Sequence, residues 1–174
     1  EDLRENMMQM LRSLVEGNVT SALSENGGIA DETGLSRLAQ SMEGIYFARG
    51  TLAGRASQIL GMKAEDLSDV IFDIAQHTYE AKEAAYGEKL MRELERVVML
   101  RVVDEYWMDN IDAMDDLKQG IGLRAYGQHD PVIAYKEEGY EMFQAMITAI
   151  REETIRRLFL VQLKPTQEVK RQKV

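Results

Sequence analysis

The sequence predicts an all-α protein, built from a long first helix, a group of short helices and a long antiparallel pair of helices. Two observations predict this class. Apolar residues recur every three or four positions through most of the chain, which is the period of one helix face. Met, Leu, Ala, Glu and Arg are abundant, whereas Pro occurs only at positions 131 and 165, a balance typical of helical proteins. No pair of β-strands is evident.

The first helix and the short helices are predicted over residues 3–64. Residues 3–24 keep one apolar face, formed by Leu3, Met7, Met10 or Leu11, Leu14, Val15 and Leu23. Residues 24–28 then end this helix, because Asn and Gly tolerate the left-handed conformation that closes a helix. Residues 29–64 predict shorter helices joined by glycines, with one apolar stripe made of Leu35, Leu38, Met42 and Ile45.

Two further helices are predicted over residues 65–86 and 88–118. The second carries two adjoining apolar stripes, which indicates burial against more than one neighbour. One stripe is Leu100, Val103, Trp107, Ile111, Met114 and Leu117, and the other is Met91, Leu94, Val98, Val102 and Tyr106. At about 1.5 Å per residue this helix is on the order of 45 Å long. Gly120 and Gly122 are expected to interrupt it, and residues 123–129 to form a loop.

The return helix begins at Asp130 and Pro131, which supply a side-chain acceptor at the cap and a Pro at the first helical position. Its apolar residues are Tyr140, Phe143, Ile147, Ile150, Thr154, Leu158 and Val161. Two long helices joined by a short connection form a hairpin. Residues 164–174 are basic and are expected to fray or to continue into missing sequence.

Composition excludes several function classes. The 174 residues, 45% of them hydrophobic, suffice for one packed domain or two small ones. A net charge of -9 argues against a nucleic-acid binder, which needs clustered Lys and Arg. The absence of Cys removes disulfides and thiolate metal sites and suits a reducing compartment. The longest aliphatic runs, of about four residues, are far shorter than the roughly 20 that span a bilayer. We therefore expect a cytoplasmic protein, and the missing initiator Met indicates a fragment.

The motifs of catalytic and metal sites are absent or incomplete. No Lys is followed by Ser or Thr, so the phosphate-binding loop of nucleotide hydrolases is missing. Asp73 and His77 lie four residues apart and could form half of a metal site, although an exposed ion pair is the commoner outcome. A cluster of carboxylates, at Asp104, Asp109, Asp112, Asp115 and Asp116, is expected to be a solvated face of the outgoing helix. We therefore expect no catalytic residues and no metal site.

Large side chains on the hairpin divide into two groups. Trp107, Ile111, Met114 and Phe143 lie on helical stripes and are predicted as structural anchors of the hairpin. Core packing is the default for the aromatic residues Trp107, Tyr106 and Phe143 and for the Met residues of these stripes. Tyr126 lies in the hairpin loop between small residues. A loop aromatic at the end of a long lever can contact a partner, but self-packing is an equally good interpretation from the residues alone.

An ordered series of segments resembles the SecA family of bacterial preprotein translocase motors. The segments are Met99-Leu-Arg-Val-Val-Asp-Glu-Tyr-Trp107, Met114-Asp-Asp-Leu-Lys-Gln-Gly-Ile121, Leu123-Arg-Ala-Tyr-Gly-Gln128, Pro131, Tyr135-Lys136 and Glu138-Gly-Tyr-Glu-Met-Phe143. The match is dense over residues 88–163 and looser over 1–87. The resemblance implies the end of a long scaffold helix at 1–26, a small helical wing subdomain at 27–75, and a helical scaffold at 76–163. The scaffold includes an antiparallel two-helix finger at about 88–161, and 164–174 is a basic linker.

The resemblance also implies a function. In the family, two RecA-like motor domains hydrolyse ATP with Mg²⁺, and the finger enters the cytoplasmic side of the SecY/SecE/SecG channel, where its tip contacts the preprotein. The finger also restrains ATPase activity through the motor domains. By this likeness Leu123, Arg124, Tyr126 and Gln128 contact the polypeptide or the channel. The protein would be cytoplasmic and peripherally associated with the inner face of the membrane, where anionic lipid is a further contact, and no nucleic acid is involved.

ATP, and the zinc held by the Cys-rich tail of many members, would belong to the parent protein, so this fragment has no cofactor. The family commonly has Arg where Lys118 stands and His where Gly122 and Asn110 stand. A Lys does not reproduce the forked geometry of a guanidinium group. Two other functions are compatible with the residues: a non-enzymatic helical interaction or regulatory module, and a metal-binding bundle.

Overall fold

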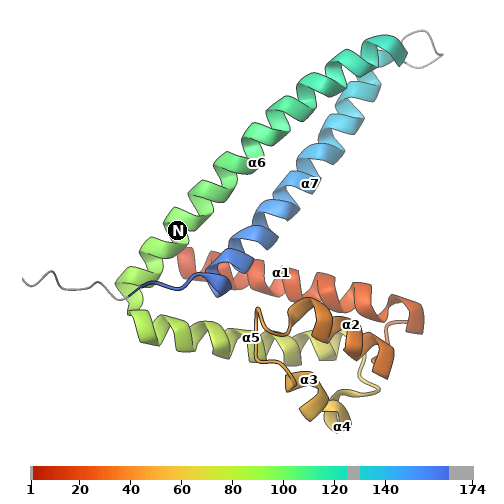
Figure 1. The fold of residues 1–174 in the computed structure, drawn as a ribbon. Helices are drawn as coiled ribbons and strands as arrows, with labels where there is room; N and C mark the ends of the chain where they lie inside the picture. The colour runs from red at the N-terminus through yellow and green to blue at the C-terminus, as the bar shows by residue number, and fades with distance from the viewer. Residues whose placement is uncertain (1, 125–129, 165–174) are drawn as a thin grey trace, which may run out of the picture.

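The computed structural model describes residues 2–124 and 130–164, and all of its named elements are helical. A base of helices carries a long hairpin that rises away from it (Figure 1). The base contains α1 (Leu3–Leu23), α2 (Glu32–Met42), α3 (Thr51–Gly54), α4 (Ala56–Ile59) and α5 (Ala64–Tyr86), and the hairpin consists of α6 (Glu88–Arg124) and α7 (Pro131–Leu160). The all-α prediction is confirmed.

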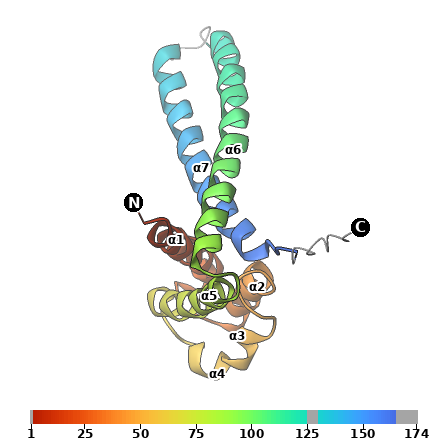
Figure 2. The ribbon, with the colours of Figure 1, turned by 90° about the vertical axis from the view of Figure 1, so that its left-hand side faces the viewer.

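Two long helices, α1 and α5, run side by side through the base, as Figures 1 and 2 both show. The Asp2 carboxylate accepts a hydrogen bond from the Arg4 backbone N–H and caps α1. The predicted stripe of α1 is buried at Met7, Leu11, Leu14, Val15 and Leu23. A short 3-10 turn, Ser24–Asn26, follows, and Gly27 adopts the left-handed conformation at φ 63°. The first predicted helix and its terminator are confirmed.

The three short helices lie between α1 and α5 in the sequence, as the glycine-punctuated stretch predicted. Asp31 caps α2 by accepting a hydrogen bond from the Gly34 N–H at 2.7 Å. Leu35, Leu38 and Met42 are buried against the base, and Ile45 packs at its edge. The chain then enters α5, which continues without a break through residue 86, so the domain boundary predicted between residues 75 and 76 falls inside a helix.

A single residue, Gly87, separates α5 from α6. Its backbone, at φ 86° and ψ 150°, lies in a region that is essentially restricted to glycine. The chain turns there from the base into the hairpin (Figure 2).

We expect Gly87→Ala to lower the free energy of unfolding by about 1–3 kcal/mol, because a side chain strains this conformation. The matched control is Gly17→Ala in the middle of α1. Gly17 is helical and a Cβ there meets nothing within 4 Å, so this variant should gain about 0.5–1 kcal/mol. Urea unfolding followed by circular dichroism measures both values. Equal effects of the two substitutions would contradict the assignment of strain to Gly87.

Two expectations about α6 are wrong. Gly120 and Gly122 do not interrupt the helix, which continues to Arg124. A glycine inside a helix costs only about 1 kcal/mol, and neighbouring Ile121 is buried in the hairpin. The expected burial against several neighbours holds only near the base, where Met91 is buried and Leu94 and Val98 pack on the main core. Farther out, Leu100, Trp107 and Ile111 are exposed, because α7 is the one helix beside them.

The return helix begins as predicted. The Asp130 carboxylate accepts a hydrogen bond from the Val132 N–H at 2.9 Å, and Pro131 occupies the first turn. The helix ends at Leu160 with Val161 extended. Its last carbonyls, of Leu158, Phe159 and Val161, accept hydrogen bonds from the Lys82 ammonium of α5. A helix end leaves its last carbonyls without intrahelical partners. The Lys82 side chain, which comes from another helix, therefore caps the C-terminus of α7.

Candidate functional site

The outer part of the hairpin, residues 107–124 and 130–143, carries an unusual amount of exposed apolar surface. Fourteen large hydrophobic side chains are exposed among the residues that the structure describes, and eight of them lie here. These eight are Trp107, Met108, Ile111, Leu123, Val132, Ile133, Tyr140 and Phe143. Isolated exposed apolar residues are ordinary, but their accumulation on one projection makes this region the candidate contact surface. We call this region the outer finger.

Two contacts and one buried side chain lie between or beside the two helices of the outer finger. Trp107 and Phe143 meet edge to face, with ring centroids 6.3 Å apart and an interplanar angle of 87°. Gly139 allows α6 to approach closely, since a Cβ built at this position would lie 2.9 Å from the Met114 methyl carbon. Ile121, nearly at the end of α6, is 5% exposed. Trp107, Met114 and Phe143 therefore lie at contacts between the two helices.

The expectation that these anchors are core residues is wrong for three of them. Trp107 is 45% exposed, Ile111 44% and Phe143 38%. A two-helix hairpin has only one internal seam, so a wide apolar stripe on either helix extends past the seam into solvent. Nearer the base the hairpin has a small core of its own, formed by Val102, Met146 and Ile150 with Tyr106 and Ile147 packed against it.

An apolar hollow lies beside the free end of the hairpin. It is lined by Lys118, Ile121, Gly122, Pro131, Val132 and Tyr135. Lys118 and Gly122, where the resemblance noted above implies Arg and His, therefore both line this hollow. A Lys places a flexible point charge there in place of a planar fork, and Gly122 contributes no side chain.

The predicted fingertip residues are only partly within the described chain. Leu123 is in the last turn of α6 and is 76% exposed. Arg124 ends the helix, and its side chain lies outside the described part. Tyr126 and Gln128 fall within residues 125–129, which also lie outside the described residues. Their contact role remains a prediction.

Acidic side chains cover another part of α6. Asp104, Asp109, Asp112, Asp115 and Asp116 are all exposed, as expected for a solvated face. Asp73 and His77 form the exposed ion pair that sequence spacing favoured, with 3.6 Å between Nδ1 and Oδ2. His77 Nδ1–H also donates to the Asp73 carbonyl at 2.7 Å, and this bond is the main cause of the raised His77 pKa. Among the described residues, no three His, Asp or Glu side chains converge on a metal position.

One buried polar group escaped sequence analysis. Glu95 is 0% exposed, and its Oε1 accepts a hydrogen bond from the Tyr79 hydroxyl at 2.5 Å. Its Oε2 lies 3.0 Å from Arg92 Nε. Burial raises the pKa of Glu95. The sequence contains a signal for this burial. Glu95 lies on an apolar stripe of the helix, four residues after Met91 and three before Val98.

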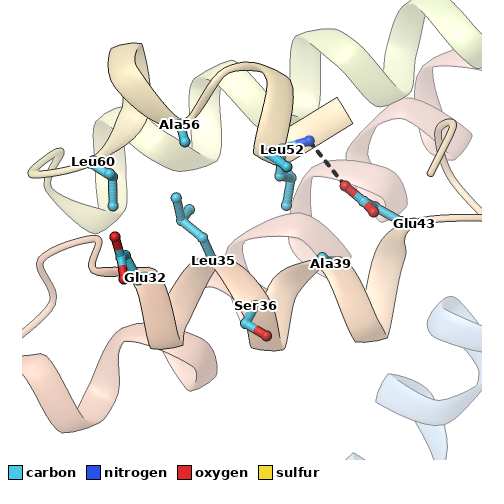
Figure 3. Close-up of a pocket in the computed structure, with 9 residues that line it drawn as sticks. Glu32, Leu35, Ser36, Ala39, Glu43, Leu52, Ala56 and Leu60 are labelled. Carbon is cyan, nitrogen blue, oxygen red and sulfur yellow. Dashed lines mark hydrogen bonds between the residues drawn. The ribbon is translucent and has the colours of Figure 1, made fainter. Parts of the chain in front are cut away.

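A second apolar groove lies in the base, between α2 and the pair α3 and α4 (Figure 3). Leu35 of α2 faces Ala56 and Leu60 across it. At one end the Glu43 carboxylate accepts hydrogen bonds from the backbone N–H groups of Gly50 at 2.9 Å and Leu52 at 3.0 Å. Glu43 therefore fixes the start of α3 and the width of the groove.

None of the helices in the described part of the chain is both long and apolar enough to cross a lipid bilayer. The longest, α6, mixes exposed carboxylates with apolar residues along its length.

Comparison with known proteins identifies the family. The model of the SecA wing and scaffold domain matches residues 1–162. The protein translocase subunit SecA of Desulforudis audaxviator is 41% identical over 179 aligned residues, covering 100% of this chain and 20% of the relative. The SecA subunit of Pelotomaculum thermopropionicum is 42% identical, with 97% of this chain and 19% of the relative covered. SecA 1 of Clostridioides difficile is 40% identical over 98% of this chain.

The chain thus spans about a fifth of the length of the curated relatives that it matches. The match extends through the base and nearly the whole hairpin, so the resemblance, dense over residues 88–163 and looser over 1–87, is confirmed in both parts. Taken with the all-helical base and the projecting two-helix hairpin, these matches show that the chain belongs to the SecA family, in its wing and scaffold region.

Proposed function

We propose that this chain is the wing and scaffold part of a protein-translocating motor, and that its two-helix finger transmits motor movement to a polypeptide in transit. The observation that supports this most directly is the outer finger, which combines a long projection with a concentration of exposed apolar side chains. A 37-residue helix at about 1.5 Å per residue reaches roughly 55 Å. Such a lever converts a small rotation at the base into a large displacement at the tip.

The chemistry of the outer finger suits contact without sequence preference. Leu123, Val132 and Ile133 present aliphatic surface near the free end, and Lys118 adds one flexible positive charge. Apolar contact is non-directional and scales with the area removed from water, so it grips a varied polypeptide or packs on a channel wall. Arg124, Tyr126 and Gln128 would add polar and aromatic contacts at the tip.

The parent protein would supply everything else. ATP and Mg²⁺ would bind to motor domains outside this chain, and zinc, where present, to a Cys-rich tail. The SecY/SecE/SecG channel and preproteins would be the partners, at the cytoplasmic face of the membrane. The finger would also restrain ATP turnover by contacts with the motor domains.

The experiment that tests this function is Tyr126→Ser in the full-length parent protein. Translocation of a preprotein into channel-containing vesicles should fall several-fold, while the thermal unfolding midpoint stays unchanged, because the tip serves contact and not folding. Leu90→Ser is the control, since Leu90 is exposed in the first turn of α6 and lies outside the outer finger. Unchanged translocation with Tyr126→Ser, or an equal loss with Leu90→Ser, would contradict the tip assignment.

A second candidate function is a helical interaction module that docks to partner proteins and transmits no movement. The apolar groove between α2 and α4 favours it, because Leu60 and Ala56 leave room for a partner side chain beside Leu35. A continuous reading frame with phosphate-loop and DEAD-type motifs upstream of this chain would decide for the motor.

A further inference from the structure

The last two turns of α5 contact both helices of the finger. On the side of α6, the Tyr79 hydroxyl donates a hydrogen bond to Glu95, and Glu83 forms an ion pair with Arg92. Lys82 donates to the carbonyls that end α7. The Tyr86 hydroxyl accepts a hydrogen bond from the Leu163 N–H just beyond α7, at 3.3 Å. Eight consecutive residues of α5, 79–86, therefore hold both legs of the hairpin.

The contact with α6 encloses a buried charge. Glu95 is fully buried, and its side chain is surrounded by the Tyr79 hydroxyl, Arg92 and Glu83. The polar atoms Arg92 Nε and Glu95 Oε2 are buried and 3.0 Å apart, but neither completes a well-aligned hydrogen bond. A buried carboxylate is stable only when its partners compensate its charge. Tyr79 and Arg92 therefore compensate the Glu95 charge, but Glu95 Oε2 has no well-aligned hydrogen bond in addition.

The same network reaches α1. Arg4 lies 2.9 Å from a Glu80 carboxylate oxygen and 3.6 Å from one of Glu83, so it links the start of α1 to the end of α5. From α7, the uncharged ring of Phe159 covers Tyr79, with centroids 5.4 Å apart. The charged and titratable groups facing Glu95 are thus Tyr79 and Glu83 of α5, Arg92 of α6 and Arg4 of α1.

The backbone between the two sides of this contact has one break. Gly87 alone connects α5 to α6, so the two helices share no continuous helical hydrogen bonding through this corner. Rotation about Gly87 redirects α6 without unwinding either helix. It must separate Tyr79 from Glu95 and Glu83 from Arg92, and it must also shift Met91, which is buried in the main core of the base. The flexible residue Gly87 and the side-chain contacts that oppose its rotation therefore lie at the same corner, between α5 and α6.

We propose that Tyr79, Glu83, Arg92 and the buried Glu95 form a releasable clasp, which together with the apolar core holds the finger in one direction and, when uncompensated, lets it shift about Gly87. We call these four side chains the corner clasp. This regulation of finger direction rests on the proposed function for its biological meaning, but the conformational claim stands on this chain alone.

The charge of Glu95 determines which changes open the corner and which close it. Opening the corner brings Glu95 to water, where a carboxylate charge is favourable, whereas closing it desolvates the charge. Removing Arg92 should therefore open the corner, and neutralising Glu95 should close it again. Burial raises the Glu95 pKa above the ordinary 4.5 in the closed state, so by linkage proton uptake favours the closed state and higher pH favours the open one.

The test measures a distance across the corner. Because the chain has no Cys, spin labels can be placed uniquely at Glu65→Cys on α5 and Gln144→Cys on α7, both exposed positions. Double electron–electron resonance at pH 7.5 should give one narrow distance distribution. Arg92→Met should broaden it or add a second, longer or shorter, population. The double variant Arg92→Met with Glu95→Gln should restore the narrow distribution.

Rescue by the second substitution separates a clasp from simple packing, because Glu95→Gln cannot replace the volume lost with Arg92. In Arg92→Met the second population should also shrink as the pH is lowered. Arg96→Met is the matched control, since Arg96 pairs with Glu93 one turn along the same helix but not across the corner, and it should leave the distribution unchanged. An unchanged distribution in Arg92→Met at preserved helicity, or a broad one that Glu95→Gln fails to narrow, would overturn the clasp. The proposed translocation role would remain open in either case.

Discussion

Ile155→Ala should lower the free energy of unfolding of this chain by about 2–5 kcal/mol. Ile155 is fully buried, and it belongs to the main core shared by α1, the short helices and the start of α6. Shortening it removes apolar contacts and leaves a cavity where α7 meets the base. Urea unfolding, followed by far-ultraviolet circular dichroism, measures the loss.

The control is Ile133→Ala on the same helix. Ile133 is 54% exposed in the outer finger, so its truncation should change stability by no more than about 0.5 kcal/mol. Similar losses for the two substitutions would show that the outer finger packs against a neighbour in this chain. A large contrast supports a hairpin that is anchored at its base and free along its outer part.

Lys82→Met should lower the free energy of unfolding by about 1–3 kcal/mol. The methionine keeps most of the aliphatic stem, but the carbonyls of Leu158, Phe159 and Val161 lose their common donor. Burial lowers the Lys82 pKa, which means that desolvation of the ammonium group already offsets part of the gain from these bonds. Hydrogen exchange of the amides in the last turn of α7 should accelerate together with the loss in global stability.

Lys89→Met tests the same chemical change at an exposed position in the first turn of α6. Its effect should be close to zero. If Lys82→Met were equally silent, the attachment of α7 to α5 would rest on apolar packing alone, and the polar contacts of residues 82–86 would carry no stability.

Local sequence rules predicted most of the helices. The spacing of Leu11, Leu14 and Val15 gave α1 because a helix that packs on one side needs one apolar face. The pair Asp130 and Pro131 marked the start of α7 because both act on the four N–H groups that begin any helix. These signals depend only on residues close in sequence, so the tertiary structure does not change what they predict.

Other features depend on partners that are distant in sequence. Lys82 and the end of α7 are more than 70 residues apart, and no local pattern pairs them. Gly120 and Gly122 favour a break in the helix by propensity alone, and this local signal does not register the burial of Ile121 between them. The apolar stripe through Trp107 predicted burial correctly near the base but not farther out, because periodicity shows which face is apolar and not how many neighbours cover it.

In the candidate site, too, some features follow from the local sequence and others depend on residues that are distant in sequence. Exposure of Leu123, Val132 and Ile133 could be read only from the structure, since a stripe of the same residues in a bundle would be buried. The buried Glu95 was visible in the sequence as a carboxylate on an apolar stripe, but its partners Tyr79 and Arg92 come from two helices that meet only after the chain turns at Gly87. Long-range geometry, and not composition, defines both the outer finger and the corner clasp.

The most direct test of the finger's role is site-specific photo-crosslinking in the full-length parent protein, with a stalled preprotein, channel and ATP present. A photoreactive side chain at position 126 should give ATP-dependent adducts with the preprotein or the channel. The same side chain at position 65, exposed on α5 in the base, should give none. Adducts from position 65 but none from position 126, while export proceeds normally, would contradict a finger that delivers movement through its tip.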